Sequence, residues 1–154
     1  MPQLTNYAYS FQDISCSIVG AGGSGLLSTA GIANEGISVE SNERVTTQFG
    51  ADGSWMHSLH AAQGGKVTIR VMKNGAANSL LDGMCNFDMA SSANMGRNLI
   101  SVRNPVTGDS WTAIGCAFTK KPVATYNVEG PAVEWTFNVG QLSGVFGSGS
   151  PSQQ

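Results

Sequence analysis

Hydrophobic and polar residues alternate with a period of two over several short stretches of this chain. Such alternation predicts β-strands that bury one side and expose the other. In residues 66–72, for example, Val67, Ile69 and Val71 share one face while Lys66 and Arg70 lie on the opposite face. The predicted strands are residues 13–19, 37–49 (one long strand or a bent pair), 66–72, 98–103, 110–119 and 133–139.

Residues rich in Gly, Pro and Asn separate these strands. The Gly-Ala-Asp-Gly sequence at 50–53 predicts a turn, and Pro105 and Gly108 predict a hairpin loop over residues 104–109. Residues 54–62 stay ambiguous, because they can pair back as a strand or form a long loop. The glycines at 64 and 65 end that segment in either case.

One segment, residues 76–89, has helical periodicity instead. Asn74 or Asn78 is expected to cap its start, and Gly83 weakens it by up to ~1 kcal/mol relative to alanine. Its apolar residues recur at steps of three and four, and they are Leu80, Leu81, Met84, Cys85 and Phe87.

About seven short strands and one helix predict a mainly β protein, an antiparallel β-sandwich or barrel with one flanking α-helix. The length fits a single domain, which we place at residues 1–147. Residues 148–154 contain Gly, Ser, Pro and Gln and are predicted to be a disordered tail.

The chain carries unusually little charge. Charged residues make up 12% of it and the net charge is −2, against ~25% charged residues in typical soluble domains. Because subunit interfaces are depleted in charge, we expect much of the surface to be covered by other copies of the chain. A Ser/Thr/Asn-rich secreted β domain is the alternative interpretation. The few basic residues form no patch for tight DNA binding, and no apolar run is long enough to cross a bilayer.

The three cysteines are Cys16, Cys85 and Cys116. Cys16 and Cys116 keep phase with apolar neighbours on predicted strands, which indicates small buried core residues. No CxxC pair occurs, so neither a zinc site nor a redox motif is predicted.

One motif imitates a nucleotide-binding site. The sequence at 20–25 reads GxGxxG after a predicted strand, and Glu40 ends another strand twenty residues after Gly20. However, no clear helix follows the glycines. The predicted strands also alternate between apolar and polar residues, whereas strands of a buried parallel sheet are apolar on both faces. A flexible loop is therefore the preferred interpretation, and nucleotide binding a remote one.

No catalytic, cofactor-binding or metal-binding residues are predicted. His57 and His60 are spaced like a metal-binding pair, but no third ligand is evident. Trp55, Met56 and Leu59 lie between two glycine turns, where they fit an ordinary core and an exposed contact patch equally well.

Several segments in order resemble a family of small phage structural proteins. The resemblance spans residues 9–147, and it identifies the chain as similar to the tail tube proteins of contractile-tailed phages. The segments that carry it are residues 9–13, 50–53, 56–60, 67–70, 90–94, 102–109 and 134–137.

The resemblance implies a structural protein of the virion tail, assembled in the bacterial host cytoplasm. It implies a β-sandwich or barrel whose copies form hexameric rings, with the inner sheets joined around a channel for double-stranded DNA. Stacked rings form the tube, with tail sheath, baseplate and tape-measure proteins as partners. We expect Phe49, Trp55, Met56 and Leu59 to contribute to the contacts between rings.

Two other functions stay open on the sequence. The first is a monomeric β-sandwich module that binds a ligand. The second, more remote, is a nucleotide-binding enzyme that uses the Gly20 loop.

Overall fold

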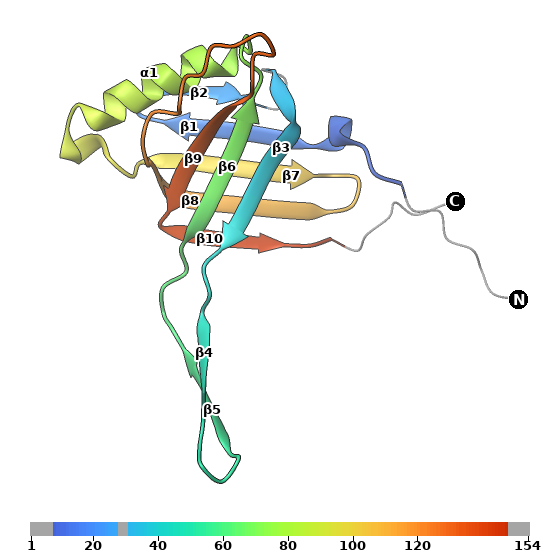
Figure 1. Ribbon diagram of the computed structural model, residues 1–154, viewed down its shortest axis with the longest axis vertical. Helices are drawn as coiled ribbons and strands as arrows, with labels where there is room; N and C mark the ends of the chain where they lie inside the picture. Colours follow the sequence, from blue (N-terminus) through green and yellow to red (C-terminus); the bar gives the residue numbers. More distant parts are fainter. Residues whose placement is uncertain (1–7, 28–30, 148–154) are drawn as a thin grey trace, which may run out of the picture.

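Ten β-strands, one α-helix and two short 3-10 helices form the described residues, 8–27 and 31–147, of the computed structural model (Figure 1). The helices are α1 (Ala77–Met89) and the 3-10 turns Phe11–Asp13 and Ser92–Asn94. The strands are β1 (Ser15–Gly20), β2 (Gly23–Leu26), β3 (Ile32–Ser41), β4 (Val45–Phe49), β5 (Trp55–Leu59), β6 (Gly65–Val71), β7 (Asn98–Asn104), β8 (Asp109–Phe118), β9 (Val133–Val139) and β10 (Gln141–Val145).

The strands form two layers that cross each other. Strands β2, β1, β7, β8 and β10 run across the long axis of the molecule and form what we call the transverse sheet (Figure 1). Strands β3, β6 and β9 run steeply along that axis and form the longitudinal sheet. All pairings are antiparallel, and β4 and β5 pair only with each other.

Strand β8 belongs to both layers. Its first part pairs with β7 and β10, whereas Ala117 and Phe118 pair with β9. Between the two parts, Gly115 adopts a φ of +68°, a value that residues other than glycine rarely adopt. The bend at Gly115 lets one strand turn the corner of the sandwich.

The core lies between the two sheets. Alternating residues of β1, β6, β8 and β9 are buried there, as their sequence periodicity predicts. Phe118 packs against Phe137 and Trp135, with ring centroids 4.6 and 5.9 Å apart. Cys16 and Cys116 are buried as predicted, and burial raises the pKa of their thiols to about 12 and about 11.

Helix α1 begins at Ala77, but the predicted cap is wrong. Ala76 occupies the N-cap position, and no side chain caps the helix. Asn78 instead fastens the helix to the longitudinal sheet: it donates to the carbonyl oxygens of Met72 and Lys73 and accepts a bond from Trp135 Nε1 at 3.1 Å. The side-chain amide of Asn78, which the local sequence predicted as a helix cap, is therefore used in contacts with other parts of the chain.

The glycine-rich segment after β1 is a β-hairpin and not a flexible loop. Residues 17–20 pair with 26–23 of β2, and the small residues allow α1 to approach closely. A Cβ atom on Gly25 would lie 2.3 Å from Leu80 Cδ2. Since the glycines of the motif lie within and between β1 and β2, and no helix begins there, the nucleotide-binding motif lacks its structural context.

The predicted fold class is confirmed. The ambiguous 37–49 segment is a bent pair, β3 and β4, and the ambiguous 54–62 segment pairs back as β5. Strands β2 and β10 were not predicted, and the predicted tail 148–154 lies outside the described residues. No helix in the described part of the chain is long and apolar enough to span a membrane.

Candidate assembly surfaces

Strands β4 and β5 form a hairpin that projects away from both sheets along the long axis (Figure 1). We call residues 42–63 the protruding hairpin. Its arms of about ten residues reach roughly 30 Å at ~3.3 Å per residue. Nearly all of its residues are exposed, although a lone two-stranded hairpin is only marginally stable in water.

The four predicted contact residues all lie exposed on this hairpin. The exposed fractions are 77% for Phe49, 66% for Trp55, 56% for Met56 and 73% for Leu59. The core interpretation of Trp55, Met56 and Leu59 is therefore wrong for the folded chain. Their contact with another subunit stays a prediction.

The hairpin has two unlike faces. Phe49 pairs with Trp55 and Val45 with Leu59, which places four large apolar side chains on one face. Met56 pairs with Gln48 and therefore lies on the opposite, mostly polar face. The apolar face gathers three of the four predicted contact residues, and we call it the aromatic face.

Hydrogen bonds link the two arms of the protruding hairpin and order its tip. Arg44 donates to the carbonyl oxygen of His60 at the base, and Thr47 Oγ1 lies 2.8 Å from His57 Nδ1 in the middle. At the tip, Ser54 donates to Asp52 from its hydroxyl and its backbone N–H. These bonds hold the pKa of Asp52 below its usual range.

The two histidines serve this framework and share no site. Three residues apart on an extended chain, His57 and His60 point to opposite faces, and each lies next to a different threonine, Thr47 and Thr46. Among the described residues, no cluster of His, Cys, Asp and Glu could hold a metal ion.

The outer face of the transverse sheet is nearly free of charge. Within the described strands, Arg103 is the one charged residue of this face. One row of directly paired residues, none of them charged, crosses all five strands. The row consists of Leu26, Ser17, Ser101, Thr112 and Ser143.

The outer face of the longitudinal sheet is charged but balanced. Glu40 lies directly opposite Lys66, and Arg70 lies 3.6 Å from Glu134. Arg70 also donates to Ser38 at 3.1 Å. Each positive side chain on these strands therefore has a carboxylate beside it.

Residues 119–132, between β8 and β9, form a further surface, which was not predicted from the sequence. This segment has no regular secondary structure and is almost wholly exposed. Three residues in its sequence, Pro122, Gly130 and Pro131, disfavour a regular strand, and the connection they belong to is unusually long.

The fold is that of proteins from contractile injection systems. At a TM-score of 0.58 and 12% identity, 86% of this chain matches 88% of a chain in the extended sheath–tube complex of the extracellular contractile injection system PVC. The PVC sheath/tube terminator gives 0.58 and 13%, with coverage of 92% and 99%. The tube-terminating cap of the anti-feeding prophage gives 0.56 and 13%, with coverage of 95% and 96%.

The family model of the Bacteriophage PhiTE tail tube protein matches residues 7–147, and the chain belongs to this family. It is therefore a structural subunit of a tail tube and not an enzyme, and the resemblance found in the sequence is confirmed. A comparison with curated proteins gives no match.

Proposed function

We propose that copies of this tail tube subunit close into hexameric rings and that the rings stack into the tube of a phage tail. The protruding hairpin carries this proposal. It exposes Phe49, Trp55 and Leu59 on one face and has no partner within the described chain. Large aromatic residues exposed together are typical of contact sites between proteins.

The direction of the hairpin suggests how the subunit sits in the tube. The hairpin continues β3 and β6 along the long axis (Figure 1). If it bridges rings, this axis lies along the tube, and the strands of the longitudinal sheet follow it. Strand β3 is then an open edge facing sideways, and pairing with a ring neighbour removes such an edge. The longitudinal sheets thus join into one barrel.

In this arrangement the outer face of the longitudinal sheet lines the channel. Arg70 pairs with Glu134, and Lys66 lies opposite Glu40 in the strand register, whereas uncompensated positive charge is what binds phosphate strongly. We infer that double-stranded DNA passes without being held. Tail sheath, baseplate and tape-measure proteins are the further partners, in a virion tail assembled in the host cytoplasm.

Electron microscopy of the purified protein, dilute and then concentrated, tests the proposal. We expect rings of uniform diameter that stack into hollow tubes. Particles that stay monomeric at every concentration would count against it and favour a ligand-binding module.

Trp55→Ala then tests the hairpin. The variant should fold normally but raise the concentration needed for tube growth about tenfold or more, the effect of losing a hot-spot side chain. Gln48→Ala, on the polar face of the same hairpin, is the matched control and should polymerise normally. Normal growth of Trp55→Ala would show that the aromatic face does not connect subunits.

A further inference from the structure

The end of the molecule opposite the protruding hairpin carries a second unpartnered surface. Residues 119–132, which we call the end loop, run past α1 and over that end before β9 begins (Figure 1). Connections of this length without secondary structure are uncommon in compact domains and are often functional.

The end loop exposes large apolar side chains. The exposed fractions are 72% for Val123, 84% for Tyr126 and 99% for Val128. A hollow on the outer face of β9 lies between Val123, Pro131 and Thr136. Another hollow is lined by Val128 together with Met72, which is also exposed. The exposed apolar side chains of the end loop therefore border two hollows, and the first of these hollows adjoins the longitudinal sheet at β9.

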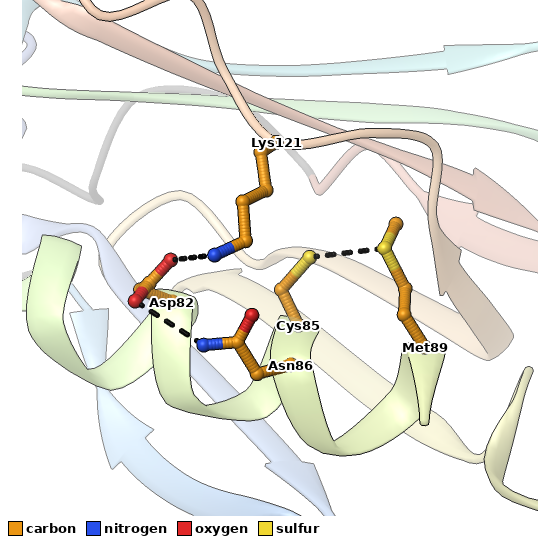
Figure 2. Close-up of polar contacts among 5 residues, drawn as sticks. All are labelled: Asp82, Cys85, Asn86, Met89 and Lys121. Atoms are coloured by element: carbon orange, nitrogen blue, oxygen red, sulfur yellow. Dashed lines mark hydrogen bonds and ion pairs between the residues drawn. The ribbon is translucent and has the colours of Figure 1, made fainter. Parts of the chain in front are cut away.

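This loop is fixed by contacts with the body. Lys121 Nζ lies 3.0 Å from Asp82 Oδ1 on α1 (Figure 2). Lys73 Nζ donates to the carbonyl oxygen of Thr125 at 2.8 Å and lies 3.9 Å from the centre of the Tyr126 ring. Because these contacts hold the loop in place, a partner would bind it with little loss of conformational entropy.

The charges of the two ends are complementary. The end loop carries Lys120, Lys121 and Glu129; Lys121 pairs with Asp82, and Lys120 has no ion pair within the described residues. At the hairpin tip, Asp52 is an exposed carboxylate that accepts two hydrogen bonds from Ser54, and no lysine or arginine occurs from 45 to 59. The Asp52 carboxylate at the tip is therefore complementary to Lys120 on a receiving surface that is otherwise partly apolar and carries charges of both signs.

We propose that the end loop and its hollows receive the tip of the protruding hairpin from a second copy of this chain. The proposal rests on the stacked-ring function and names the surface that the hairpin meets. The two surfaces differ and lie at opposite ends of the long axis, so the contact is head-to-tail. A head-to-tail contact that does not close adds copies without limit along one axis, as growth of a tube requires.

Disulfide trapping in the assembled protein tests the proposal. Ala51 is exposed at the tip, and the double variants Ala51→Cys/Val123→Cys and Ala51→Cys/Val128→Cys place one thiol at each end. The native thiols Cys16, Cys85 and Cys116 are buried, so only the introduced thiols should react. After mild oxidation, a non-reducing gel of at least one double variant should show a ladder of linked chains well beyond the dimer.

Two controls make the result specific. Ala51→Cys/Ser143→Cys, which pairs the tip with the transverse sheet, should give no ladder. A mixture of the single variants Ala51→Cys and Val123→Cys should stop at the dimer, because each chain then carries one thiol. A ladder in the Ser143 control equal to that of the test variants would overturn the proposal.

Electron microscopy of the same samples distinguishes a wrong receiving surface from a wrong stacked-ring function. Tubes without a ladder in either test variant would refute the receiving surface and leave the stacked-ring function intact. Monomers at every concentration, again without a ladder, would refute both.

Discussion

Strands β5 and β6 follow each other along the chain, yet they have opposite roles. In β6, Val67, Ile69 and Val71 are buried between the two sheets. In β5, Trp55 and Leu59 share a face of the protruding hairpin and are exposed. The comparison teaches that apolar side chains on one face of a strand are buried only where a second layer covers that face. β6 has that layer within the chain, and we propose that β5 finds it in another copy.

The largest difference should appear when each strand loses one apolar side chain. Ile69→Ala should lower the free energy of unfolding by about 2–5 kcal/mol, because a cavity is left in a packed core. Leu59→Ala should change it by less than about 0.5 kcal/mol, as exposed substitutions do. Urea unfolding of the unassembled subunit measures both. Equal losses would mean that the hairpin packs on the body in solution.

Polar contacts should show the same contrast on a smaller scale. Asn98 is buried and donates to Asp88 Oδ2 and, at 3.2 Å, to the carbonyl oxygen of Cys116. Asn98→Ala should cost about 1–3 kcal/mol, since it removes a partner of a buried carboxylate. Thr47→Val breaks the exposed contact with His57 and should have little effect on global unfolding in the same assay. A neutral Asn98→Ala would show that Asp88 is satisfied without it.

A further predicted effect is a loss of stability at alkaline pH, which arises in the two sheets and not in the hairpin. Burial raises the pKa of Cys16 to about 12 and of Cys116 to about 11, against 9.0 in the unfolded chain. Above pH 9 the unfolded state therefore binds fewer protons than the folded state, and stability falls as pH rises.

Unfolding midpoints at pH 8 and pH 10 measure this slope, and Cys16→Ala should reduce it. The hairpin has no buried thiol, so hairpin NMR signals should stay constant between these pH values. An unchanged slope in Cys16→Ala would remove that thiol as the cause.

Much of the architecture could be predicted from local sequence. The alternation in β6, β7, β8 and β9 predicted their positions and their buried faces, because a sheet with one covered side imposes a period of two. Helix α1 was predicted within a residue of its start from its three- and four-residue spacing. The charge deficit indicated a protein covered by its own copies, and the order of its segments indicated the tail tube family.

Only the tertiary structure decided how these elements are used. It turned the GxGxxG sequence into the β1–β2 hairpin, because β2 found an open edge on β1 and α1 needed close approach. It assigned Asn78 to Trp135 rather than to the helix start, and it brought the end loop and the protruding hairpin to opposite ends of the molecule (Figure 1). Local sequence records the preferences of neighbouring residues, but which surface stays uncovered is set by contacts between segments distant in the chain.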